Sequence, residues 1–329
     1  MQVSTFCLGT MVLGAWGNTD HDECVGMIHA ALDAGVNFVD TADVYAFGES
    51  EEIVGRALRG RRDDVIVATK FFNAMSDDPN QRGASRRWIV RAVDDSLRRL
   101  ETDWIDLYQV HRPDPDTDLD ETLGALSDLV HAGRIRAFGT STFPAELLVE
   151  AQWTAQRRGY ERPATEQPPY SILAREIEAS VLPTCLRYGL GALVWAPLNG
   201  GWLTGKYRDG RAPTSSRADR TPDHFDFGGP IHDRKMAVVE ELAAVASEAG
   251  LTLPDLAHAF VLAHPAVTAA IIGPRTPEQL HQVLAGADTS LSADVLDRID
   301  ALVPPGVTLN PADAGYQPPA LEDATLRRR

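Results

Sequence analysis

The strongest constraint on the fold is an alternation along the chain between short apolar runs and longer amphipathic segments. The short runs are rich in Val and Ile, whereas the segments between them carry apolar residues three and four positions apart. Near-continuous apolar runs are typical of strands that are covered on both faces, and the second spacing is typical of helices. The strand candidates are residues 5–8, 36–39, 64–69, 104–110, 135–139, 164–166, 190–194 and 268–272.

Strands that are separated by helical crossovers form parallel sheets, and eight such units predict an α/β fold of the closed (β/α)8 TIM-barrel type. One expected helix begins near Ser50 and ends at Gly60, and another buries Ile89 and Val93. A third is expected to have Pro144 in its first turn, where proline is favoured.

An open doubly wound sheet is the main alternative for this alternation. Its nucleotide site usually carries G-x-G-x-x-G directly after the first strand. Residues 9–14 read GTMVLG, and no other stretch supplies that spacing. The closed barrel is therefore favoured.

We expect residues 1–329 to form a single barrel with additions near its C-terminal end. Residues 199–230, rich in Gly, Pro and Arg, predict a long loop after the seventh strand, followed by an additional helix around residues 256–262. A loop this long is usually a lid or a binding loop. The Pro-rich tail, residues 304–329, lies beyond the last expected helix and is either disordered or folded over the barrel mouth.

The charge balance restricts the partners. Lys and Arg total 31 against 47 Asp and Glu, which gives a net charge of −16. Nucleic acids and anionic membrane surfaces are repelled by such a chain, so neither is an expected partner. The nine histidines form no H-E-x-x-H motif and no Cys/His cluster, so no metal site is expected.

The cysteines and the N-terminus indicate a cytoplasmic protein. Cys7, Cys24 and Cys185 are an odd number without close spacing, as expected of reduced thiols. Residues 1–5 lack the features of a signal peptide, and no apolar run reaches the length that spans a bilayer.

Barrel enzymes carry their chemistry at the carboxyl ends of the strands. Each polar residue there also has a simpler explanation: Asp40 could cap a turn, and Lys70 could be a solvated loop lysine. The convergence of four titratable groups on one barrel mouth would nevertheless be unusual. The residues that follow the candidate strands are Gly9, Thr10, Asp40, Lys70, His111, Ser141, Gln167, Trp195 and Gly273, and Tyr45 comes five residues after Asp40.

The chemistry of four of these groups fits together. A phenol with a pKa near 10 is a poor acid at neutral pH. A nearby ammonium favours the phenolate, and a carboxylate keeps the ammonium charged and oriented. Asp40, Lys70 and Tyr45 thus predict a tuned general acid, and His111 predicts a group that orients a carbonyl oxygen.

Residues 37–45, 48–51, 67–70, 106–111 and 271–275 together resemble the aldo-keto reductase pattern, in order and over essentially the whole chain. Residues 195–207 resemble the branch that includes potassium-channel β-subunits and many bacterial reductases. The resemblance implies an NADP(H)-dependent oxidoreductase that reduces a small aldehyde or ketone. Its catalytic tetrad would be Asp40, Tyr45, Lys70 and His111.

The resemblance also implies the contacts with the cofactor. Ser141 and Gln167 would bind the nicotinamide carboxamide, and Trp195 would stack on its ring. Pro197, Leu198 and Gly200 would lie along the pyrophosphate, under Thr204, Lys206 and Arg217. Further expected contacts are Gly9, Thr10, Met11, Asp40, Gly273, Arg275, Gln279 and Gln282.

NADP(H) is favoured over NAD(H) because Arg275 precedes a helix that begins at Thr276–Pro277, and helix N-termini bind anions such as a 2′-phosphate. The sequence departs from the family pattern at three places. Thr142 stands where many members carry Asn, and Gln282 and Val283 replace the usual Glu and Asn.

Trp16 and Phe47 are expected to shape an apolar substrate pocket beside Tyr45 and His111. Two other functions remain open. Lys70 could be a Schiff-base nucleophile, as in barrel aldolases. The protein could also be a regulatory subunit that binds NADP(H) and turns over slowly, although it retains His111, where the channel subunits depart from the tetrad. The sequence does not indicate an oligomeric state.

Overall fold

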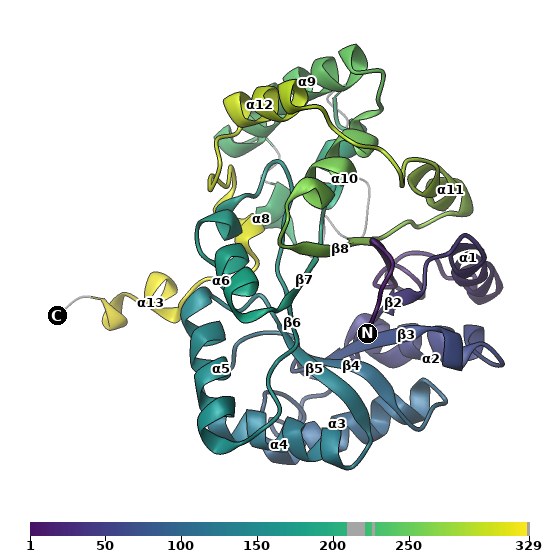
Figure 1. Cartoon of the computed structure of the whole chain (residues 1–329), viewed down its shortest axis with the longest axis vertical. Coiled ribbons are helices and arrows are strands. Elements are labelled where there is room, and N and C mark those ends of the chain that lie inside the picture. Colours follow the sequence, from purple (N-terminus) through teal and green to yellow (C-terminus); the bar gives the residue numbers. More distant parts are fainter. Residues whose placement is uncertain (209–220, 226–227, 328–329) are drawn as a thin grey trace.

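Eight parallel strands close into a barrel in the order in which they occur along the chain, which confirms the predicted (β/α)8 architecture (Figure 1). This computed structural model describes residues 1–208, 221–225 and 228–327. All eight strands begin and end within two residues of their expected positions. They are β1 (Phe6–Gly9), β2 (Phe38–Asp40), β3 (Ile66–Phe71), β4 (Ile105–Val110), β5 (Ile135–Ser141), β6 (Thr165–Gln167), β7 (Gly191–Val194) and β8 (Val267–Ile272).

Helices cover the outside of the barrel (Figure 1). Their starts are set by side-chain caps: Asp20 accepts hydrogen bonds from the first turn of α1, and Ser85 does so for α3. Pro144 is the N-cap of α5 and not, as expected, a first-turn residue, because its ψ of 158° is still extended. The helices are α1 (His21–Asp33), α2 (Glu49–Ala57), α3 (Arg86–Arg99), α4 (Leu119–His131), α5 (Ala145–Arg158), α6 (Val181–Tyr188) and α11 (Pro277–Ala285).

The barrel interior is divided into an apolar layer and a polar layer. Cys7, Phe38, Ala68, Leu107, Leu193 and Ala269 form a buried apolar cluster of their own. Side chains two positions apart on a strand share a face. Asp40, Lys70 and Gln109 each follow a member of that cluster by two positions, so the strand register places them in the next layer towards the carboxyl ends.

The chain between β7 and β8 is more helical than expected. It contains a 3-10 helix (Asn199–Thr204), α8 (Pro222–Phe225), α9 (Pro230–Glu248) and α10 (Leu253–Ala263). The single helix expected around residues 256–262 is α10. The apolar pattern did not predict α9, because its buried apolar residues, Val239, Leu242 and Val245, occupy only its second half. α12 (Ala293–Leu302) lies beside α9 (Figure 1).

The three cysteines are free and buried, as the sequence predicted. Burial raises the pKa of the Cys185 thiol to about 12 and that of Cys7 well above its usual value, so both stay protonated at neutral pH. None of the helices in the described ranges combines the length and apolarity needed to cross a membrane.

The tail was expected either to be disordered or to fold over the barrel mouth. Its first half is ordered and folds back against the barrel. The backbone N–H of Leu309 donates to Leu173 at 3.0 Å, and the N–H of Arg175 donates to Val307 at 3.1 Å. A 3-10 helix (Pro311–Ala314) follows, and then α13 (Pro319–Glu322), which projects away from the barrel (Figure 1).

A buried cluster of charges ties this tail to the segment after β7. One carboxylate oxygen of Asp313 lies 2.7 Å from Lys235 Nζ, on α9, and accepts a hydrogen bond from Asn199 Nδ2 at 2.9 Å. The other oxygen lies 2.6 Å from His224 Nδ1. Burial alone would raise the pKa of Asp313, but His224 and Lys235 outweigh it, so the pKa is lowered. Asp313 is therefore ionised at neutral pH and is the counter-charge of Lys235.

We predict that Asp313→Ala destabilises the protein by about 3–5 kcal/mol, because it leaves Lys235 buried without its counter-charge. The urea-unfolding midpoint measures the change. Asp323→Ala is the matched control, since Asp323 is an exposed acid in the same tail. Equal stabilities for the two variants would contradict the role given to the cluster.

Candidate active site

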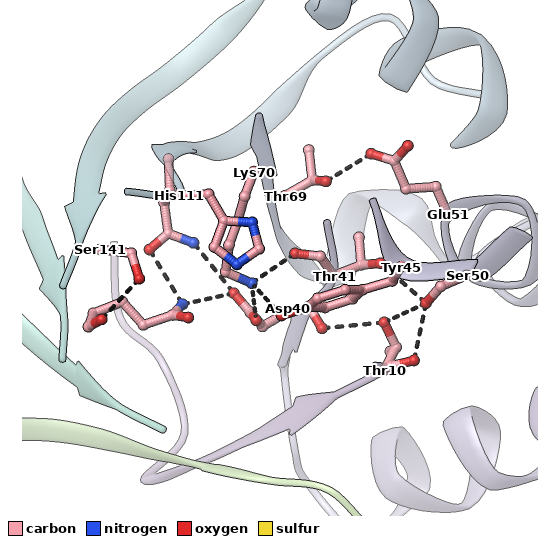
Figure 2. A network of polar contacts seen from close by, with 12 residues as sticks. Thr10, Asp40, Thr41, Tyr45, Ser50, Glu51, Thr69, Lys70, His111 and Ser141 are labelled. Atoms are coloured by element: carbon pink, nitrogen blue, oxygen red, sulfur yellow. Dashed lines mark hydrogen bonds and ion pairs between the residues drawn. The ribbon is translucent and has the colours of Figure 1, made fainter. Parts of the chain in front are cut away.

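The four titratable groups that the sequence singled out lie together at the barrel mouth (Figure 2). Asp40 is the last residue of β2, Lys70 lies near the end of β3, and His111 directly follows β4. Tyr45 begins a 3-10 turn (Tyr45–Gly48) that leads from β2 to α2. Three neighbouring strands of one parallel barrel thus present them at the same end.

Lys70 is the centre of this arrangement. Its Nζ donates to Asp40 Oδ1 at 2.5 Å, to the carbonyl oxygen of Thr41 at 2.8 Å and to the Tyr45 hydroxyl at 3.3 Å. The side chain is fully buried. Burial would lower the pKa of Lys70, but the charge of Asp40 and the Tyr45 hydroxyl outweigh it, so the pKa is raised. The amine is therefore a charged ammonium at neutral pH, with all three donors used.

The carboxylate of Asp40 is held by more than Lys70. Its second oxygen accepts hydrogen bonds from Gln167 Nε2 at 2.8 Å and from Gln109 Nε2 at 3.2 Å. Ser141 Oγ donates to the backbone carbonyl of Gln167 at 2.9 Å. No sequence pattern singled out Gln109, although its position on β4, two residues before His111, was the signal that could have identified it.

A second buried network fixes α2 against the barrel. Glu51 accepts hydrogen bonds from Thr69 Oγ1, on β3, and from Arg99 Nε, on α3, both at 2.6 Å. Ser50 Oγ donates to the carbonyl oxygen of Thr10 at 2.9 Å (Figure 2). The turn that carries Tyr45 therefore ends in a helix with a fixed position.

A strained backbone holds the start of this turn. Ala46 and Phe47 have φ angles of 48° and 54°, in the left-handed region that residues other than glycine rarely adopt. The Tyr45 ring packs edge-on against His111, with ring centroids 5.9 Å apart. Trp16 lies 6.1 Å from the Tyr45 ring and 6.3 Å from that of Phe47, which is 66% exposed. Trp16 therefore lies against both Tyr45 and Phe47.

His111 is a neutral imidazole held by a residue that the sequence analysis missed. Burial lowers its pKa well below the usual value, and the charges of Arg112 and Lys70 lower it further. Asn73 Nδ2 lies 3.0 Å from Nδ1 and donates to it, which leaves the proton of the neutral ring on Nε2. Asn73 is placed there by Phe72, whose φ is 137°. No sequence pattern indicated that backbone angle.

The expected nicotinamide contacts lie on adjacent strands. Ser141 and Gln167 are paired at the ends of β5 and β6, and Trp195 follows β7. A Cβ atom on Gly315 of the tail would lie 2.7 Å from the Trp195 ring and 3.2 Å from Thr142, so the tail touches this side of the mouth.

The segment expected at the pyrophosphate is a glycine turn beside a lysine. Gly200 and Gly201 have φ angles of 68° and 101°, which favour glycine. Lys206 Nζ lies 2.8 Å from the point that a Cβ on Gly201 would occupy, and Thr204 Oγ1 donates to the Gly201 carbonyl at 2.7 Å. Arg217 lies outside the described residues. Pro197 and Leu198 directly precede the turn.

The first turns of α11 present the expected adenosine contacts on one face. Thr276 caps this helix as predicted, since its side chain accepts from Gln279 N. Gly273, Arg275, Gln279 and Gln282 are all exposed there. The exposed guanidinium and the helix N-terminus are suited to a phosphate.

The end of β1 lies beside Asp40. Gly9 is paired with Asp40, and Thr10 Oγ1 donates to the Asp40 carbonyl at 3.2 Å. Thr10 is fully buried, so its hydroxyl supports the backbone of Asp40, whereas Met11 is partly exposed. No group of three or more His, Cys, Asp or Glu suited to a metal ion occurs in the part of the chain that the structure describes.

A buried carboxyl group lies in the barrel wall next to this site. Glu166, on β6, accepts hydrogen bonds from Thr140 Oγ1 at 2.5 Å and from Phe143 N at 3.0 Å. Burial raises the pKa of Glu166 to about 8, although these two hydrogen bonds lower it. Glu166 is therefore mostly protonated at neutral pH.

The fold and the site together define a barrel protein with a buried ion pair, a tyrosine and a histidine at its mouth. Comparison with known proteins gives its family. Residues 5–304 match the model of the aldo/keto reductase family. A probable voltage-gated potassium channel subunit beta of Oryza sativa subsp. japonica is 38% identical over 300 residues, covering 88% of this chain and 91% of the relative.

Two bacterial relatives from Bacillus subtilis (strain 168) are similarly close. The uncharacterized oxidoreductase YrpG is 38% identical over 315 residues, covering 92% of this chain and 93% of the relative. The aldo-keto reductase YhdN is 38% identical over 286 residues, covering 85% and 84%. The chain belongs to the aldo/keto reductase family, and this membership indicates an oxidoreductase that acts on carbonyl compounds.

The raised pKa of Glu166 predicts a pH dependence of stability. The folded state keeps a proton that the unfolded state releases above its ordinary pKa, so stability falls as pH rises from about 4.5 to about 8. Over that range, we expect the free energy of unfolding of wild type to fall by roughly 2–4 kcal/mol more than that of Glu166→Gln.

Urea unfolding of both proteins across that pH range measures this difference. The titration of His111 affects both proteins equally and cancels in the comparison. Parallel stability curves for wild type and Glu166→Gln would show that Glu166 is already ionised in the folded protein.

Proposed function

We propose that the protein is an NADPH-dependent carbonyl reductase in which Tyr45 is the general acid. The observation that carries the proposal is the chain of contacts from Asp40 Oδ1 through Lys70 Nζ to the Tyr45 hydroxyl, at 2.5 and 3.3 Å. Bound NADPH supplies the hydride that the carbonyl carbon accepts, and Tyr45 donates a proton to the carbonyl oxygen.

The environment of Tyr45 suits a proton donor. When its hydroxyl gives up a proton, the remaining phenolate lies within hydrogen-bonding distance of the Lys70 ammonium. An adjacent positive charge stabilises a phenolate, and the carboxylate of Asp40 keeps that charge in place. The buried ammonium acts on the phenol without donating its own proton.

His111 complements this donor. Its neutral ring, with the proton on Nε2, is a hydrogen-bond donor for a carbonyl oxygen. An imidazolium would compete with Tyr45 as the acid, and the low pKa of His111 prevents that at neutral pH. We therefore assign His111 to orientation and polarisation, and Asn73 to positioning His111.

The residues at the mouth fit a dinucleotide. Ser141, Gln167 and Trp195 would supply polar groups and a ring for a nicotinamide, and Lys206, beside the turn at Gly200–Gly201, would supply a cation for a diphosphate. The exposed Arg275 at the start of α11 supports NADPH over NADH, because a 2′-phosphate needs a cation.

The environment of Lys70 argues against a Schiff-base aldolase. A nucleophilic lysine must be neutral and reach the substrate carbon. Lys70 is fully buried, uses its three donors and has a raised pKa. Both requirements are therefore unmet.

A regulatory subunit is the second candidate, supported by the 38% identity to the rice protein named a probable potassium channel subunit beta. The two functions differ in turnover. Stoichiometric binding of NADPH without oxidation in the presence of a broad panel of aldehydes and ketones would favour the regulatory function.

We predict that Tyr45→Phe lowers kcat for NADPH-dependent aldehyde reduction by about 10²- to 10⁴-fold, because the proton donor is lost. The Kd for NADPH, measured by fluorescence titration, should stay close to that of wild type. Tyr188→Phe is the matched control, since it removes the hydroxyl of a tyrosine at the end of α6, away from the mouth. Unchanged turnover in Tyr45→Phe would exclude Tyr45 as the acid.

Asn73 offers a separate test of the role given to His111. In Asn73→Asp, a carboxylate faces Nδ1 and stabilises the imidazolium, so the pKa of His111 rises towards neutrality. We expect a new inflection in the pH profile of kcat between about pH 6 and 8. Asn80→Asp, in the same loop but exposed, should keep the wild-type profile. A profile without the new inflection in Asn73→Asp would mean that Asn73 does not position His111.

A further inference from the structure

Arg112 is a cation at the barrel mouth with no carboxylate partner. No Asp or Glu oxygen lies within 4.0 Å of its guanidinium in the ranges that the structure describes. Among the residues that the structure describes, its guanidinium donates one hydrogen bond, from Nη1 to the backbone carbonyl of His111 at 2.6 Å. A guanidinium has five N–H donors in a planar fork, so most of its binding capacity is unused.

The position of this guanidinium places it over the mouth of the barrel. Arg112 follows β4, yet its Cζ lies 5.8 Å from the centre of the Trp195 ring, which follows β7. Because β4 and β7 are separated by two strands around the barrel, a side chain that joins them extends across the mouth. Arg112 is partly exposed there.

The other charges at the mouth are already balanced. The ammonium of Lys70 is paired with Asp40, and His111 is neutral. Glu166 is mostly protonated at neutral pH and is bonded to Thr140 and Phe143. Arg112 therefore leaves a local positive charge in a chain whose net charge is −16.

Burial lowers the pKa of Arg112, while Tyr45 and Glu166 act in the opposite direction. A desolvated cation without a counter-charge costs free energy, and a bound anion would recover it.

We infer that Arg112 binds a carboxylate of the substrate, so that the preferred substrates are aldehydes or ketones that also carry a carboxylate. This inference rests on the proposed reductase function and specifies its substrate class. One planar guanidinium matches the two oxygens of a carboxylate, in bidentate geometry. The rings of Trp16 and Phe47 at the mouth suit an aromatic or otherwise apolar body between the carboxylate and the carbonyl.

The test compares two substrates that differ only in charge. 4-Carboxybenzaldehyde and methyl 4-formylbenzoate are measured with NADPH for wild type, Arg112→Met and Arg112→Lys. We expect the ratio of kcat/KM for the acid over the ester to fall on the order of 10- to 100-fold in Arg112→Met. Arg112→Lys should keep part of the preference for the acid over the ester, because the positive charge remains but the planar pair of N–H donors is lost.

Arg136→Met is the matched control, since it removes an exposed positive charge at the amino end of β5, which is the end of the barrel away from the mouth. Its ratio should equal that of wild type. An equal ratio in Arg112→Met and wild type would overturn the inference. A weaker NADPH affinity in Arg112→Met with an unchanged ratio would overturn it too, because Arg112 would then serve the cofactor.

A binding measurement separates this inference from the reductase function. Calorimetry with benzoate and benzamide needs no turnover, and wild type should prefer benzoate about tenfold or more, with the preference lost in Arg112→Met. Absence of turnover with either aldehyde, together with this preference, would refute the reductase and leave the carboxylate site. Equal binding of benzoate and benzamide to wild type would refute the carboxylate site, whatever the turnover.

Discussion

The ion pair between Lys70 and Asp40 is the interaction on which the rest of the site depends. Two opposite charges lie inside a barrel, where removal from water costs several kcal/mol per ion. The pair persists because its partners are complete: Lys70 uses three donors, and Asp40 accepts from Lys70, Gln109 and Gln167. Loss of one partner would leave an uncompensated charge, so the network fixes the amine beside the phenol.

The strand register explains why this polar layer forms without weakening the whole barrel. Phe38, Ala68 and Leu107 fill the interior one layer below, and each is followed two positions later by a residue of the Asp40 network. The apolar layer excludes water from below, which strengthens the electrostatic interactions above it. Stability and chemistry are thus assigned to different ends of the same strands.

The sequence could predict what depends on periodicity and could not predict what depends on irregular backbone. The apolar alternation was sufficient to predict the barrel. Parallel strands bring Asp40, Lys70 and His111 to one end of it, because side chains along a strand repeat every two residues. The contact of Asn73 with His111 depends on the unusual φ of Phe72. The burial of Asp313 depends on contacts with α9 and with the segment after β7, which no local pattern encodes.

The residues other than glycine with positive φ are concentrated at the mouth. Ala46, Phe47 and Phe72 follow β2 and β3, and Thr142, Ala196 and Asn199 follow β5 and β7. Each such conformation costs of order 1–3 kcal/mol, so contacts with the surrounding strands and helices must hold these turns in place. The geometry of the mouth is therefore a property of the folded barrel, and the isolated turns would rarely adopt it.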